Sequence, residues 1–202
     1  TAISMFFVPW ILVKAWILPL PDTVQEQVDE AIGHGFDGMI VYVDQAGKPP
    51  EFYTAGWKDR ENKLPAHHKS LFKIASISKL YTAVAATKLV KEKRLSFNKT
   101  LADYLPELRN RIENAEEITL RMMIQHRSGI PNFTDNPAYW ENEQENGKNA
   151  LDFALDLQAT FKPNGGYKYS NTNYLLLRMI MDNILGYSHN LYIKEKILIP
   201  LE

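Results

Sequence analysis

The 202-residue sequence contains no cysteine, and this absence removes three kinds of chemistry. A chain without cysteine forms no disulfide bond, holds no zinc ion through thiolates and offers no thiol nucleophile. The absence does not decide the compartment, because a cytoplasmic protein and a cell-envelope protein that needs no disulfide are both compatible with it.

The sequence also lacks an excess of charge of either sign. It carries 23 Lys and Arg residues against 24 Asp and Glu residues, which gives a formal net charge of −1. It has no basic stripe and no alternation of basic with aromatic residues, so we expect no nucleic-acid partner. With 45% hydrophobic residues and no low-complexity tract or internal repeat, the composition is that of a globular chain of one domain, or one and a part.

A strongly apolar segment occupies residues 1–20, with the sequence TAISMFFVPWILVKAWILPL. Lys14 lies inside the apolar run, and Pro9 and Pro19 break it. From Met5 onward it is shorter than the roughly 20 residues of a membrane-spanning helix, and it has neither a basic start nor a small-x-small cleavage site. Three interpretations remain open: a remnant of a signal sequence or membrane anchor, a segment docked on the fold, or an interfacial hairpin near a substrate entrance.

Candidate metal ligands are few. His67 and His68 are adjacent in the polar stretch 59–69, which predicts a loop, but no cluster of Asp, Glu and His with ligand spacing accompanies them. We therefore expect two surface histidines and no metal site.

Residues 21–202 predict a helix, a hairpin and then a mostly helical body. Pro21 to His34 has the spacing of an amphipathic helix with Asp22 as its N-cap. Phe36–Asp44 and Phe52–Trp57 predict two strands of a hairpin, because a turn rich in glycine and proline joins them. Further patterns predict helices at residues 76–90, 120–126, 150–159, 174–185 and 191–199, and a long polar loop at 132–149. Thr119 is expected to be the N-cap of the helix at 120–126.

The central stretch of the chain is FKIASISKLYTAVAATKLV, which contains Ser76 and Lys79. If Ser76 is the first residue of a buried helix, the two side chains lie on one face, one turn apart. A lysine in a low-dielectric site can take the proton of a hydroxyl, and the free N–H groups of a helix start favour a developing oxyanion. The alternative is a serine N-cap followed by a surface lysine.

The Ser-x-x-Lys spacing occurs three times, and context separates the copies. Ser96 and Lys99 lie in a polar stretch that predicts a turn. Ser70 and Lys73 lie in an alternating segment that predicts extended chain, where the two side chains do not stack. Only the copy at residues 76–79 opens a helix apolar enough to be buried.

A second chemical stretch is PNGGYKYSNTNYLLL, which contains Tyr169 and Asn171. Two residues apart on a loop ahead of a helix, both side chains can point into a cleft. A phenol can relay a proton, and a carboxamide can donate to a substrate carbonyl and orient a lysine. The alternative is a turn with an aromatic plug and an asparagine cap.

Together, and in this order, the two stretches resemble the serine β-lactamase and penicillin-binding protein family: class C β-lactamases, D-alanyl-D-alanine carboxypeptidases and related esterases. The similarity covers roughly residues 22–201 and includes LFKIASISKLYTA, ITLRMMIQHRSGIPNF and PNGGYKYSNTNYLLL. The resemblance implies an α+β fold, with an antiparallel sheet beside a helical domain and the site between them. It also implies that Ser76 is the acylated nucleophile, Lys79 its general base, Tyr169 a proton shuttle and Asn171 a substrate-binding residue that also orients Lys79.

The sequence departs from the family pattern at two places. Class C β-lactamases usually have glycine before the nucleophile, where this chain has Ala75; alanine is common among the carboxypeptidase- and esterase-like relatives, so β-lactam hydrolysis is expected to be weak. The family's third motif, a Lys or His with glycine on a strand beside the site, is not found. We therefore expect residues 21–202 to be the N-terminal and helical part of a domain truncated at its C-terminus, with open hairpin edges and unpaired apolar surface.

The resemblance implies a serine hydrolase that acts on an amide or ester through an acyl-enzyme, without metal or organic cofactor. Its partners would be small-molecule or peptide substrates, and its location the bacterial cell envelope. His126 is a second candidate base, but in the resemblance its segment shapes the floor of the site and Lys79 fills the role. The alternative function is a non-catalytic protein that binds penicillin or cell-wall peptide.

Overall fold

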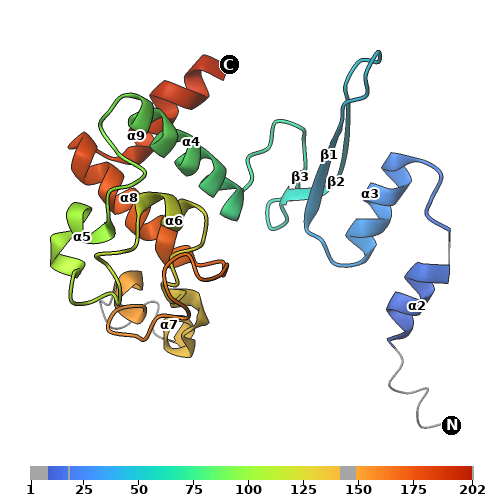
Figure 1. The fold of residues 1–202 in the computed structure, drawn as a ribbon. Helices are drawn as coiled ribbons and strands as arrows, with labels where there is room; N and C mark the ends of the chain where they lie inside the picture. The colour runs from blue at the N-terminus through green and yellow to red at the C-terminus, as the bar shows by residue number, and fades with distance from the viewer. Residues whose placement is uncertain (1–8, 18, 142–148, 202) are drawn as a thin grey trace, which may run out of the picture. The chain divides into compact units, whose positions relative to one another are not determined.

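The structure is a computed structural model that describes residues 9–17, 19–141 and 149–201. The chain divides into two compact units, Thr1–Lys73 and Ile74–Glu202 (Figure 1). The first unit contains every described strand, and the second consists of helices and helical turns joined by loops.

The first described element is the short apolar helix α2 (Trp10–Ile17). Its Trp16 side chain is 91% exposed. Among the described residues, no helix is both long and apolar enough to cross a bilayer. Residues 1–8 and 18 of the predicted apolar segment lie outside the described part of the chain. The three interpretations of that segment therefore remain predictions.

Helix α3 (Val24–Gly33) begins at Thr23, and the prediction of Asp22 as its N-cap is wrong. The Thr23 hydroxyl accepts the N–H of Glu26, and the Glu26 carboxylate accepts the N–H of Thr23. This reciprocal pair is a capping box, formed by a threonine and a glutamate three residues later, and it sets the start of the helix at Thr23. Val28 is buried where α3 packs on the hairpin.

The predicted hairpin is confirmed as the antiparallel pair β1 (Gly38–Val43) and β2 (Glu51–Asp59). A short third strand, β3 (Leu64–Pro65), pairs with β2 in a stretch that the sequence predicted as loop. Gly56 has a φ of +72°, and a Cβ built there would lie 2.4 Å from the Asp37 carbonyl oxygen. Glycine is therefore required for β1 and β2 to approach at this point.

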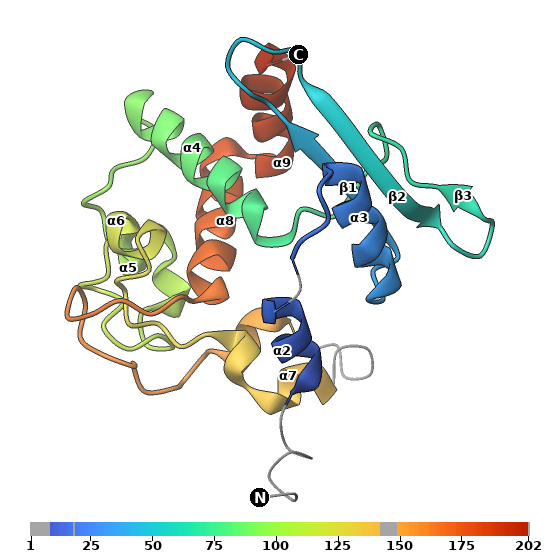
Figure 2. The same cartoon turned by 90° about the vertical axis from the view of Figure 1, so that its right-hand side faces the viewer.

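The second unit is built around α8 (Asn171–Leu185). Its buried side chains pack against α4 (Ser78–Lys91), where Ala85 and Ala86 leave room for close approach. Figures 1 and 2 both show α4 beside α8. The other helices of this unit are α5 (Leu101–Tyr104), α6 (Leu120–Ile124), α7 (Pro137–Glu141) and α9 (His189–Ile193).

Several predicted boundaries differ from the structure. The helix predicted at 150–159 is a 3-10 turn at Ala150–Phe153. The loop predicted at 132–149 contains a 3-10 turn at Phe133–Asp135 and helix α7. Residues 142–148 of that loop lie outside the described part of the chain. The last predicted helix is α9 continued by a π-helical turn, Lys194–Leu198. Thr119 caps α6 as predicted.

The sequence predicted a buried helix here, and the structure buries one face of α4. Thr82, Ala85, Ala86 and Leu89 form the buried stripe. Leu80 is 63% exposed and lies on the opposite stripe. The sequence does not show which face of this helix is buried, because both faces carry aliphatic side chains.

Candidate active site

Ser76 lies in a 3-10 turn, Ala75–Ile77, that leads directly into α4. The prediction that Ser76 begins the α-helix is therefore off by two residues. The Ser78 hydroxyl donates to the Ala75 carbonyl at 2.7 Å and closes the turn. Ala75 has a φ of +44°, a left-handed conformation that L-residues adopt at a cost. The turn places Ser76 on the exposed side of the helix start.

The structure brings together the hydroxyl of Ser76, the amine of Lys79 and the phenol of Tyr169. The Lys79 Nζ atom donates to Ser76 Oγ at 3.0 Å. Ser76 Oγ and Tyr169 Oη are 2.8 Å apart, and either atom can be the donor. Both distances are ordinary hydrogen bonds. Two groups that can exchange a proton therefore contact the same hydroxyl oxygen, although one comes from a segment 93 residues away.

The electrostatics around Tyr169 favour its ionised form. Burial raises the pKa of Tyr169, but the hydrogen bonds with Lys79 and Ser76 and the positive charge of Lys79 together lower it by more than burial raises it. The net pKa therefore lies below the ordinary value of 10. The Lys79 Nζ atom lies 5.1 Å from the centre of the Tyr169 ring. A phenol whose pKa moves towards neutrality is better suited to pass a proton in either direction.

Asn171 is the first residue of α8 rather than a loop residue. Its side-chain oxygen accepts from Tyr169 Oη at 3.3 Å, and its side-chain nitrogen donates to Thr134 Oγ1 at 3.1 Å. Its backbone N–H donates to Asn132 Oδ1 at 2.9 Å. The carboxamide is therefore oriented from two sides, with its oxygen towards the phenol.

A frame of buried polar groups holds the segment that carries Tyr169 and Asn171. Ser170 and Thr172 both donate to the Pro131 carbonyl, at 3.3 and 2.7 Å. The Ser128 hydroxyl donates to Asn173 Oδ1 at 2.6 Å. No buried side-chain nitrogen or oxygen in the described part of the chain lacks a partner. Because an unmade buried hydrogen bond is expensive, this frame fixes the register of the two segments.

His126 lies behind Tyr169 in this frame. Its Nδ1 atom accepts the backbone N–H of Ser170 at 3.1 Å, and its ring centre lies 4.6 Å from that of Tyr169. Burial lowers the pKa of His126, and the charge of Lys79 lowers it further. The sequence predicts His126 as a second candidate base and, through the resemblance, its segment as the floor of the site. It predicts no role for Asn132 or Thr134. The His-x-Ser-Gly stretch was a signal for this region, but not for these contacts.

The described residues contain no group of three or more His, Asp or Glu side chains placed to hold a metal ion. His67 and His68 are both exposed, and their rings lie 4.0 Å apart.

A small hollow of about 90 Å³ lies beside the candidate site. Ser78, Lys79, Asn171 and Arg178 contribute polar groups to its lining. It has room for a few water molecules, each of which occupies about 30 Å³ in the liquid.

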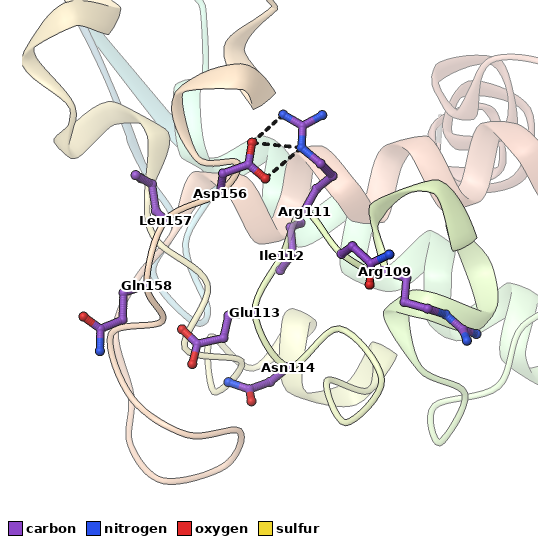
Figure 3. Close-up of a pocket in the computed structure, with 9 residues that line it drawn as sticks. Arg109, Arg111, Ile112, Glu113, Asn114, Asp156, Leu157 and Gln158 are labelled. Atoms are coloured by element: carbon purple, nitrogen blue, oxygen red, sulfur yellow. Dashed lines mark hydrogen bonds and ion pairs between the residues drawn. The ribbon is translucent and has the colours of Figure 1, made fainter.

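A larger hollow of about 380 Å³ lies elsewhere in the second unit, between residues 109–114 and 156–158 (Figure 3). Arg111 and Asp156 face each other there and share three hydrogen bonds. The Glu113 carboxylate accepts the N–H of Ala159 at 2.6 Å. These three charged groups therefore join the two segments of the chain.

The chain is similar to known bacterial proteins over most of its length. Protein flp of Staphylococcus aureus (strain MW2) is 27% identical over 189 residues, which cover 91% of this chain and 38% of that protein. Penicillin-binding protein 4* of Bacillus subtilis (strain 168) is 28% identical over 171 residues, which cover 83% of this chain and 37% of that protein. The chain thus spans less than two fifths of the length of these relatives.

Solved structures share the fold. The D-amino acid amidase from Ochrobactrum anthropi SV3, complexed with L-phenylalanine, matches 88% of this chain and 48% of its own with a TM-score of 0.73 and 26% identity. The octameric penicillin-binding protein homologue from Pyrococcus abyssi matches 96% of this chain and 43% of its own with a TM-score of 0.72 and 26% identity. These matches confirm the predicted α+β fold class, with an antiparallel sheet and a helical part.

The sequence profile of the beta-lactamase family matches residues 20–202, which include both chemical stretches. The predicted family is therefore confirmed, and the chain belongs to the beta-lactamase family.

Proposed function

We propose that the protein is a serine acyl-hydrolase in which Ser76 forms an acyl-enzyme with an amide or ester substrate. The observation that carries the proposal is the hydrogen-bonded group of Ser76, Lys79 and Tyr169. A serine is a weak nucleophile until a base takes its proton, and this serine has two proton-exchanging groups within hydrogen-bond distance.

In the proposed acylation step, Lys79 is first in its uncharged amine form. The Ser76 oxygen bonds to the substrate carbonyl carbon while its proton passes to that amine, which becomes the ammonium. The tetrahedral intermediate then collapses, the bond to the leaving nitrogen or oxygen breaks, and that atom receives a proton through the phenol of Tyr169. Water next attacks the acyl ester, the bond between the Ser76 oxygen and the acyl carbon breaks to give the free acid, and a proton from the water restores the Ser76 hydroxyl. Overall, an amide or ester and water give an acid and an amine or alcohol.

In the proposed complex, Asn171 orients the substrate. Its side-chain oxygen is bonded to Tyr169 and its nitrogen to Thr134, so substrate binding to the carboxamide requires one of these bonds to open. The bond to Tyr169 is the longer, at 3.3 Å, and is the one we expect a substrate group to replace.

The proposed substrate class rests on similarity to known proteins, not on contacts with a bound substrate. An amidase and penicillin-binding proteins are among the proteins to which the chain is similar, so we propose an acyl group carried on an amide or a peptide, with simple esters as further substrates. With Ala75 before the nucleophile, we propose that turnover of β-lactams is slow. The cell-envelope location also stays a proposal, which fractionation of cells probed with an antibody to the chain would test.

The test is intact-mass spectrometry of the full-length protein after incubation with a penicillin and, separately, with an activated ester. We expect a covalent adduct that maps to Ser76 and is absent from Ser76→Ala. The matched controls are Ser70→Ala and Ser96→Ala, which remove the serines of the other two Ser-x-x-Lys pairs and should leave the adduct in place.

The same experiment separates a hydrolase from a binding protein. Decay of the adduct within minutes supports turnover, whereas an adduct that persists for hours favours a protein that only captures its ligand. Absence of any adduct from both reagents on the folded protein would overturn the acyl-enzyme mechanism.

A further inference from the structure

His126 accepts two hydrogen bonds, from the residues on either side of Tyr169. The His126 carbonyl oxygen accepts the N–H of Lys168 at 3.1 Å, and its ring atom Nδ1 accepts the N–H of Ser170 at 3.1 Å. One residue thus holds the peptide groups on both sides of the proposed proton shuttle. The backbone of His126 has a φ of +57°, a conformation in which histidine is enriched over most other residues.

The His126 ring also contacts two tyrosine rings. The His126 side chain is buried, at 9% exposure, and its ring centre lies 4.6 Å from that of Tyr169 and 5.2 Å from that of Tyr174. Tyr174 belongs to the buried face of α8 and donates to the Ile124 carbonyl at 3.1 Å. The imidazole therefore connects Tyr169 to a rigid part of the fold.

The hydrogen bond to Ser170 fixes the protonation state of the ring. An imidazole nitrogen accepts a hydrogen bond only through its free lone pair, so the single ring proton must be on Nε2. A second proton would put an N–H on Nδ1, facing the N–H of Ser170, and the bond would be lost. The titratable or charged groups around the ring are Lys79 from α4, Tyr174 from α8, and Tyr167 and Tyr169 from the preceding loop.

We propose that His126 is a positioning residue for catalysis: as a neutral imidazole it holds the Ser170 peptide, and through it keeps the Tyr169 phenol beside Ser76. The inference rests on the proposed acyl-hydrolase function. It gives His126 no contact with substrate and no proton transfer of its own. Its effect is on the 2.8 Å distance between Tyr169 Oη and Ser76 Oγ, on which proton transfer depends.

Two substitutions distinguish the role of the Nδ1 acceptor of His126 from the role of its aromatic ring. His126→Asn keeps an oxygen acceptor near the position of Nδ1 and tolerates a positive φ, but it has no aromatic ring. His126→Phe keeps an aromatic ring and has no acceptor. His34→Phe is the matched surface control, because His34 is exposed and lies in the first unit.

The experiment measures the rate at which an activated ester acylates Ser76 in the full-length protein, as a function of ester concentration. We expect His126→Phe to lower the maximal rate about tenfold or more, because a buried N–H is left without a partner, while the half-saturating concentration stays the same. His126→Asn should retain most of the rate, and His34→Phe should match the unchanged protein. If His126→Phe does not fold, His126→Gln replaces it, since its acceptor reaches the position of Nε2 instead.

Two further measurements distinguish positioning from a purely structural role. Below the pKa of His126 the maximal acylation rate should fall in the unchanged protein, and this step should be missing in His126→Asn, which has no titratable group there. Nitrogen-15 NMR should show His126 with an unprotonated Nδ1 and a proton on Nε2.

The outcomes are distinct. If the unchanged protein is not acylated at Ser76, the proposed function fails and this inference fails with it. If it is acylated and the folded variant without an acceptor reacts as fast, or if NMR finds the proton on Nδ1, the inference alone is overturned.

Discussion

Ala75 carries backbone strain immediately before the candidate nucleophile. Its φ of +44° is reached by alanine at a cost of about 1–2 kcal/mol, a penalty that glycine does not have. We therefore predict that Ala75→Gly raises the free energy of unfolding by about 1 kcal/mol, measured by urea denaturation. The gain is smaller than the strain because glycine also loses more entropy on folding.

A helical alanine provides the control for this prediction. Ala83 lies inside α4, where glycine is unfavourable, so Ala83→Gly should lower the free energy of unfolding by about 1 kcal/mol. If both substitutions destabilise the protein equally, the left-handed conformation at Ala75 carries no strain.

The pKa of the Tyr169 phenol depends on Lys79. Burial alone raises this pKa, and the interactions with Lys79 and Ser76 bring it below the ordinary value of 10. Replacing the amine by an apolar chain in Lys79→Met should therefore raise the pKa of Tyr169, so the phenol ionises at higher pH. Carbon-13 NMR of the tyrosine Cζ atoms measures the titration.

Another lysine gives the matched control for that titration. Lys99 Nζ lies 5.0 Å from the ring centre of Tyr104, and Lys99→Met removes a similar charge at a different tyrosine. It should leave the titration of Tyr169 unchanged. An unchanged Tyr169 titration in Lys79→Met would show that the amine does not act on the phenol.

At the scale of elements, the loop at residues 126–132 and the start of α8 form one rigid support for the site. Gly129 in this loop has a φ of +78°, and a Cβ built there would lie 2.0 Å from the Phe161 carbonyl oxygen. That oxygen belongs to the backbone and cannot swing aside. We predict that Gly129→Ala lowers the free energy of unfolding by about 3 kcal/mol, from the unfavourable φ and the displaced backbone together.

The control uses a glycine with the same backbone angle and open space. Gly186 ends α8 with a φ of +76° and has no atom within 4 Å of a built Cβ. Gly186→Ala should cost only the unfavourable φ, about 1 kcal/mol. Equal losses from the two variants would mean that contact with Phe161 adds nothing.

The sequence predicted the elements whose signals are local. The hairpin follows from two β-rich segments and a turn, and the cap at Thr119 follows from the residue type before an apolar helix. The grouping of Ser76 with Lys79 follows from helical spacing, whereas the approach of Tyr169 was expected only through the family resemblance.

The sequence did not predict what depends on contacts between distant segments. The hydrogen bonds of Asn132 and His126 to residues near 170 have no local signature, because any polar side chain can serve as a partner once the fold brings it there. The positive φ of Ala75 could not be predicted either, because alanine rarely adopts a left-handed backbone conformation. Aspartate and threonine are both common helix caps, so residue type alone does not separate Asp22 from Thr23; the reciprocal contact with Glu26 does.

At the scale of the whole molecule, the chain spans 48% of the amidase structure that it resembles, and its second unit carries exposed apolar side chains. Ile77, Leu80 and Val84 follow one another at helical spacing and form the exposed stripe of the 3-10 turn and α4. The C-terminal residues Leu198, Ile199 and Leu201 are exposed as well. Apolar side chains exposed along one face of a helix in this way favour association.

We therefore predict that the 202-residue chain associates with itself in a concentration-dependent way, which sedimentation velocity would measure. Replacing two aliphatic side chains of the stripe in Leu80→Gln/Val84→Gln should weaken the association about tenfold or more, because each buried aliphatic side chain contributes about 1.5–3 kcal/mol. Lys91→Gln, an exposed polar change on the same helix, should leave it unchanged. A chain that sediments as a monomer at every concentration would show that this surface drives no association, and equal association in the double variant would place the contact elsewhere.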